Sequence, residues 1–112
     1  MSGDWRAHAE HILTAIAKLG RIVARGNIAE DDILYDAALR NLQTMAEASQ
    51  KLPESLKAQY PEIEWRKISA FRNIIVHNYL GDIDPETIAG VITDHAEPLG
   101  VVVAKMLAGP GK

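Results

Sequence analysis

Apolar residues recur every three or four positions along most of the chain, which is the spacing of one face of an α-helix. The periodicity predicts helices over about 5–25, 31–51 and 63–81, a short helix or turn over 53–59, and a last helix from 85 onwards. The β-prone run 101–103 is short and has helical pattern on both sides. We therefore expect an all-α fold, an antiparallel bundle of four main helices plus one short helix.

Several helix ends carry recognisable signals. Asp4 is a plausible N-cap for the first helix, and Gly26 with Asn27 should end it. Asp84-Pro85-Glu86 is a strong start signal for the last helix. Pro98 and Gly100 lie inside that helix and predict a kink or a break near Glu97.

The segment 63–81 is apolar around almost its whole circumference, which is typical of a helix that is buried on most sides. Arg72, Asn73 and His77 nevertheless lie within it. A buried cation or imidazole without a partner costs several kcal/mol, so such groups are paired, hydrated or kept for a function.

Helical spacing divides this segment into two faces. One face is assigned to the core of the protomer and contains Ile68, Phe71, Ile74 and Ile75. The other is mixed and contains Arg66, Asn73, Val76, His77 and Leu80. We expect a mixed face of this kind to pack against a partner surface that is crossed by a polar cleft.

Size and composition narrow the possible domain organisation, location and ligands of the protein. A chain of 112 residues is expected to form one domain, over about 4–107, with a disordered tail at 108–112. It has no cysteine, no apolar run long enough to span a membrane and no signal-peptide pattern, so a cytoplasmic location is expected. The net charge of −3 argues against a broad electrostatic grip on nucleic acid. Positive charge for RNA would have to be local, at Arg66, Lys67 and Arg72.

The pattern Arg72-x4-His77-x-Tyr79 resembles the signature of the HEPN superfamily, and specifically its small HepT-like toxin branch. The likeness covers about 4–107 and includes the runs 37–42, 46–48, 60–63 with 65–66, and 79–81 in the same order. The resemblance implies a metal-independent endoribonuclease that needs no cofactor and acts as a homodimer, with the motif helices facing each other. It also implies neutralisation by a small nucleotidyltransferase antitoxin, which can attach AMP to the motif tyrosine, here Tyr79.

These residue types suit such chemistry. Histidine transfers protons in either direction near neutral pH, so His77 is assigned to proton transfer. Arginine offers a permanently charged fork, so Arg72 is assigned to the phosphate, and Asn73 to orienting phosphate or imidazole. Tyr79 could donate to phosphate or stack on a base, and Arg66 is an additional candidate for RNA contact.

Several of these residues could instead have a purely structural role. Arg72 could bridge to an acidic residue of another helix, and His77 could donate to a backbone carbonyl inside the core. Asn41 is interpreted as a core residue bonded to a neighbouring helix. The remaining candidates are interpreted as structural or surface residues: His8, His11, Arg40, Glu47 and Trp65. In particular, the pair His8 and His11 lacks a third metal ligand at a matching spacing.

A second class of function remains open from the sequence. The chain could be a non-catalytic helical adaptor or regulatory subunit that binds a nucleotidyltransferase or a nucleotide. Its net acidity favours this alternative slightly.

Overall fold

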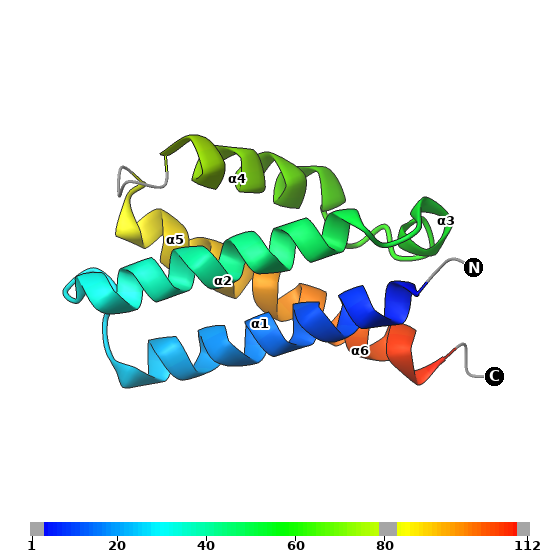
Figure 1. Ribbon diagram of the computed structural model, residues 1–112, viewed down its shortest axis with the longest axis horizontal. Coiled ribbons are helices and arrows are strands. Elements are labelled where there is room, and N and C mark those ends of the chain that lie inside the picture. Colours follow the sequence, from blue (N-terminus) through cyan, green and yellow to red (C-terminus); the bar gives the residue numbers. More distant parts are fainter. Residues whose placement is uncertain (1–3, 79–82, 110–112) are drawn as a thin grey trace.

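The computed structural model describes residues 4–78 and 83–109 (Figure 1). Its helices are α1 Trp5–Arg25, α2 Asp32–Gln50, α3 Glu54–Lys57, α4 Trp65–Asn78, α5 Pro85–Val91, the π-helical turn η1 Ile92–Ala96, and α6 Glu97–Ala108. The described part of the chain contains no strand, and four long helical segments accompany the short α3. The prediction of an all-α bundle is therefore confirmed. The predicted tail falls partly outside the described residues, but Ala108 is the last residue of α6.

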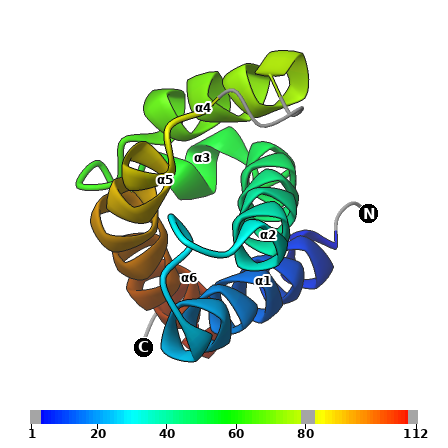
Figure 2. The same cartoon turned by 90° about the vertical axis from the view of Figure 1, so that its left-hand side faces the viewer.

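The helices form an elongated bundle in which α2 lies between α1 and α4 (Figures 1 and 2). α2 packs antiparallel to both of these neighbours, while α6 packs against α1. α5, η1 and α6 follow one another without a break and form the fourth long segment. The largest fully buried side chains come from all four segments: Ile12, Leu19, Leu42, Met45, Ile75, Ile88, Leu99 and Val103. α4 therefore lies at the edge of the bundle, on α2.

Two aspartates fix the starts of helices that frame the site. Asp31 Oδ1 accepts hydrogen bonds from the backbone N–H groups of Ile33 at 3.0 Å and Leu34 at 3.4 Å at the start of α2. Asp84 Oδ2 accepts from the Thr87 N–H at 3.2 Å, which confirms the predicted start of the last helix. Asp4 precedes α1 as predicted, but its side chain makes no capping hydrogen bond.

The predicted kink near Glu97 takes the form of a π-helical turn. Pro98 has no N–H to donate, and its ring conflicts with the carbonyl of Asp94, four residues earlier, in a regular α-helix. The wider turn over Ile92–Ala96 lies directly before this position, and the chain continues as α6 with helical backbone angles at Glu97. The proline is thus accommodated without breaking the helical run.

The position of α4 corrects one prediction about its faces. Ile68 and Ile75 are buried and Phe71 is half-buried, as predicted, but the Ile74 side chain is 47% exposed. The prediction that Ile74 belongs to the core is wrong because α4 is covered mainly by α2, which leaves its outer side uncovered. The mixed face is confirmed for Arg66, Asn73, Val76 and His77, which are all exposed, whereas Leu80 lies outside the described residues.

Contacts near both ends of α4 hold it in place. Lys57 is buried, donates to the Ser49 carbonyl at 3.4 Å and lies 5.7 Å from the centre of the half-buried Trp65 ring. The Trp65 indole N–H donates to the Tyr60 carbonyl at 3.1 Å. Beyond the C-terminal end of α4, the Tyr35 hydroxyl of α2 donates to the Ile83 carbonyl. The start of α4 is thus fixed to the segment that precedes it, and the chain at Ile83 is fixed to α2.

Candidate active site

The side chain of Arg72 is held by a carboxylate of α2. Arg72 donates from Nε at 3.3 Å and from Nη2 at 3.1 Å to the same oxygen, Oε2 of Glu47. The ion pair is partly open to solvent, since 32% of the Arg72 side chain and 41% of the Glu47 side chain are exposed. The structural reading in which Arg72 bridges to another helix is confirmed. The pair does not bury the guanidinium, however, so Arg72 remains accessible to a ligand.

Two amides extend this ion pair into a network of four side chains. Gln43 donates from Nε2 to Glu47 Oε2 at 3.1 Å, one turn away on α2. Arg72 donates from Nη1 to Asn73 Oδ1 at 3.3 Å on α4. Because Glu47 accepts from both helices, it links the position of Arg72 to the surface of α2.

The network leaves part of the guanidinium unused. An arginine side chain has five N–H donors, and the contacts to Glu47 and Asn73 engage three of them. Within the part of the chain that the structure describes, one N–H on each Nη nitrogen has no acceptor. A guanidinium whose Nε edge is fixed and that keeps two unused N–H groups is suited to bind phosphate oxygens.

His77 is exposed in the last turn of α4, one turn beyond Asn73 on the same side of the helix. The alternative of a core histidine bonded to a backbone carbonyl is therefore wrong. Arg66 is also exposed, about two turns before Asn73, and no contact joins it to the Arg72 network. Tyr79 lies outside the described residues.

The remaining polar candidates do not join this site. Asn41 donates from Nδ2 to the Ala37 carbonyl of its own helix at 2.8 Å, so the predicted bond to a neighbouring helix is wrong. The rings of His8 and His11 lie edge to face, 6.4 Å apart. Over residues 4–78 and 83–109 there is no group of three or more His, Asp or Glu residues that could hold a metal ion.

Sequence reasoning missed two members of the network. Glu47 was interpreted as structural and Gln43 was not singled out, although the two lie four residues apart on one face of α2. That spacing was the available signal. It could not pair Glu47 with Arg72, because the register between α2 and α4 is set by packing.

Comparison with known proteins identifies the family. The model of the family described as "Ribonuclease HepT-like" matches residues 12–106. The chain is similar to a "Probable ribonuclease HepT" of Thermococcus cleftensis, at 36% identity over 46% of this chain and 51% of that protein. It is also similar to a "Putative RNase" of Caldanaerobacter subterraneus, at 25% identity over 68% of this chain and 70% of that protein. No solved structure matches the chain.

The chain belongs to the HepT-like ribonuclease family, and the resemblance read from the motif helix is confirmed. The similar segment spans only about half the length of the Thermococcus relative. Within the described residues, no helix is both long and apolar enough to cross a membrane.

Proposed function

We propose that this protein is an endoribonuclease that cleaves RNA without a metal ion, through attack of a 2′-OH on the adjacent phosphate. The observation that carries the proposal is that one helix carries a fixed but accessible Arg72 and, five residues later, an exposed His77. Membership of the HepT-like ribonuclease family supports the same activity.

The reaction requires two proton transfers and a group that stabilises the negative charge of the transition state. A base removes the proton from the 2′-OH, whose oxygen then forms a bond to phosphorus, and the bond to the 5′-oxygen breaks as an acid protonates that oxygen. The products are a 2′,3′-cyclic phosphate and a free 5′-OH. His77 serves in proton transfer because an imidazole can act as base or acid near neutral pH.

Arg72 binds the phosphate through the N–H groups that its neighbours leave free and stabilises the charge of the pentavalent transition state. Asn73 accepts from Arg72 and orients the guanidinium. Glu47 is a positioning residue, because it fixes the Nε edge of Arg72 and does not itself face the phosphate.

One protomer supplies only one His77, so we propose that two protomers meet through their α4 helices and that each histidine performs one proton transfer. The exposed Ile74 supports this arrangement. It presents apolar surface on the helix that carries Asn73 and His77, and apolar surface of this kind is stabilised by burial against a partner.

We further propose that the enzyme acts as a toxin and that a nucleotidyltransferase antitoxin neutralises it by transferring AMP to Tyr79. A charged nucleotide at that position would block the cleft sterically and repel the RNA backbone. Arg66, exposed on the same helix, is a candidate for contact with RNA outside the reacting phosphate.

Incubation of the purified protein with RNA in excess chelator tests the activity. Cyclic-phosphate ends are expected from the wild type and not from His77→Ala. The absence of products from wild-type protein that carries no AMP on Tyr79 would instead indicate the non-catalytic adaptor.

A further inference from the structure

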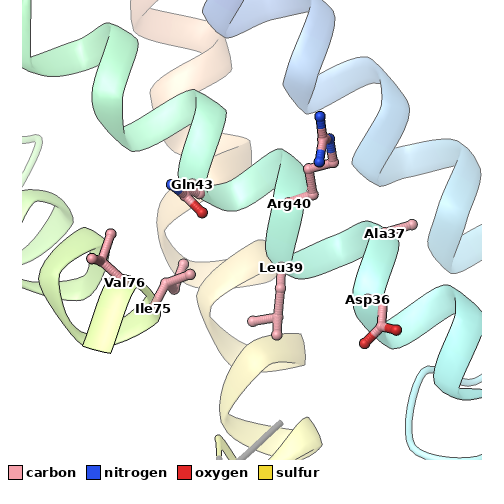
Figure 3. Close-up of a pocket in the computed structure, with 7 residues that line it drawn as sticks. All are labelled: Asp36, Ala37, Leu39, Arg40, Gln43, Ile75 and Val76. Carbon is pink, nitrogen blue, oxygen red and sulfur yellow. The ribbon is translucent and has the colours of Figure 1, made fainter. Parts of the chain in front are cut away.

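A groove lies beside the Arg72 network, between α2 and the C-terminal half of α4. Its volume is about 750 Å3, within the range of roughly 300–1,000 Å3 of small-molecule sites. Figure 3 shows Gln43 pointing from α2 toward Ile75 and Val76 of α4, with Leu39, Arg40 and Asp36 farther along α2. The groove thus combines aliphatic side chains from two helices with polar groups from one.

The groove adjoins the candidate active site. Gln43 lines it and also donates to Glu47, the residue that holds Arg72. On the opposite wall, Val76 directly precedes His77. Because α2 rises about 1.5 Å per residue, Gln43 and Arg40 lie roughly 6 and 10 Å from Glu47 along the helix axis. A ligand whose phosphate is at Arg72 would therefore extend directly into the groove.

The positive charge beside the groove lies on its α1 side. Arg40 is exposed at the rim and points toward α1 (Figure 3). It also lines a neighbouring hollow of about 180 Å3 between α1 and α2, together with Lys18, Thr14 and Asn41. In a chain of net charge −3, this places two cations, Arg40 and Lys18, beside neutral polar groups on the α1 side of α2. Such a local set is suited to a phosphate rather than to an extended polyanion surface.

We propose that the groove binds a nucleotide that flanks the cleaved phosphodiester of single-stranded RNA. The base lies against Leu39, Ile75 and Val76, and the next phosphate lies at Arg40. The apolar walls accept the face of an unstacked base, while Gln43 and Asp36 offer hydrogen bonds to its edge. The assignment of RNA as the ligand rests on the proposed ribonuclease function.

Titration with nucleoside monophosphates tests the groove without requiring catalysis. Protein with 13C-labelled methyl groups is titrated with AMP, GMP, CMP, UMP and inorganic phosphate. The methyl signals of Ile75 and Val76 should shift with at least one nucleotide and not with phosphate alone, whereas those of Val101, which is exposed on α6, should stay unchanged. Unchanged groove methyls with all four nucleotides, or equal shifts with phosphate alone, would overturn the proposal.

Arg40→Ala, compared with Arg25→Ala, tests the phosphate contact. The probe is a 2′-O-methyl RNA, which lacks the attacking hydroxyl and cannot be cleaved. Arg40→Ala should weaken its binding severalfold and reduce the slope of log K against log salt by about 0.7, the contribution of one single-strand phosphate. A probe that is shorter by the flanking nucleotide should bind both variants equally. Equal effects of the two substitutions on the longer probe would refute the contact.

These binding measurements separate the two proposals. Nucleotide-dependent shifts in a protein that cleaves no RNA would refute the ribonuclease function and retain the groove. RNA cleavage by a protein whose Ile75 and Val76 methyl signals do not shift would refute the groove proposal and retain the ribonuclease function.

Discussion

Arg72 of α4 and Glu47 of α2 form a side-on ion pair in which Nε and Nη2 of the arginine share one carboxylate oxygen, at 3.3 and 3.1 Å. The partners are 25 residues apart in the chain and join the motif helix to its neighbour. Because both side chains are partly exposed, the pair contributes only about 0–1 kcal/mol to the free energy of unfolding. Its main effect is on where the guanidinium is held.

Substitution of Glu47 by Ala should reduce kcat while changing stability little. Loss of the carboxylate frees the Nε edge of Arg72, and misplacement of a catalytic group by about 1 Å costs on the order of 100-fold. The measurement is a double-mutant cycle on kcat with Arg72→Ala. In the Arg72→Ala background, Glu47→Ala should have no further effect, whereas equal losses in both backgrounds would show that Glu47 acts independently of Arg72.

His77→Ala should reduce RNA cleavage by roughly 100- to 10,000-fold, the usual contribution of a general acid or base. The fold should be retained because His77 is exposed. Circular dichroism and cleavage rates measured together test both statements, with His8→Ala on α1 as the control. A His77→Ala protein as active as the control would refute the assignment.

Arg72→Lys should lower kcat by roughly 100-fold, comparable to the removal of one preorganised donor to the transition state. A lysine keeps the charge, but it cannot donate to Glu47 side-on and to phosphate with a second edge. Arg25→Lys, an exposed change on α1, serves as the control for cleavage rates. Wild-type rates in Arg72→Lys would show that the guanidinium fork is not required.

Ile74→Asp should dissociate the proposed dimer. Burial of an isoleucine contributes about 1.5 kcal/mol or more, and a two-fold interface contains it twice, so Kd should rise at least about 100-fold. Sedimentation equilibrium measures this change. The control is Ile33→Asp at the start of α2, whose side chain is 74% exposed. If both variants retain the wild-type association state, the interface does not involve this part of α4.

Local sequence signals were sufficient for most of the fold. The acidic cap and proline at Asp84 and Pro85 specify a helix start through contacts within one turn, so the start of α5 could be predicted. Pro98 correctly indicated an irregularity in the last helix. Its form, a π-helical turn over Ile92–Ala96, could not be read from the proline alone.

The environment of α4 was harder to predict because an apolar surface has two explanations. Ile68 and Ile75 are apolar because they are buried in the protomer, whereas Ile74 is apolar and exposed. Helical periodicity gives the direction of each side chain but not how many neighbours a helix has. An apolar face that is covered within the protomer and an apolar face that is left exposed therefore have the same pattern.

The sequence predicted which types of residue form the candidate site, but only part of the arrangement of those residues in space. The spacing of Arg72, Asn73 and His77 on one helix fixes their relative directions. The partner of Arg72 depends on the register between two helices, and the groove depends on the space that side chains leave between them. Glu47 and the groove residues were therefore beyond the reach of the sequence pattern.

Activity in mixtures of wild-type and His77→Ala subunits, after subunit exchange, tests the central claim most directly. The account places one histidine from each protomer in a shared site, so only wild-type homodimers cleave RNA. Activity should then fall as the square of the wild-type fraction, to about a quarter in an equal mixture of freely exchanging subunits. A linear fall, to about half in the same mixture, would show that each protomer acts alone and would contradict the shared site.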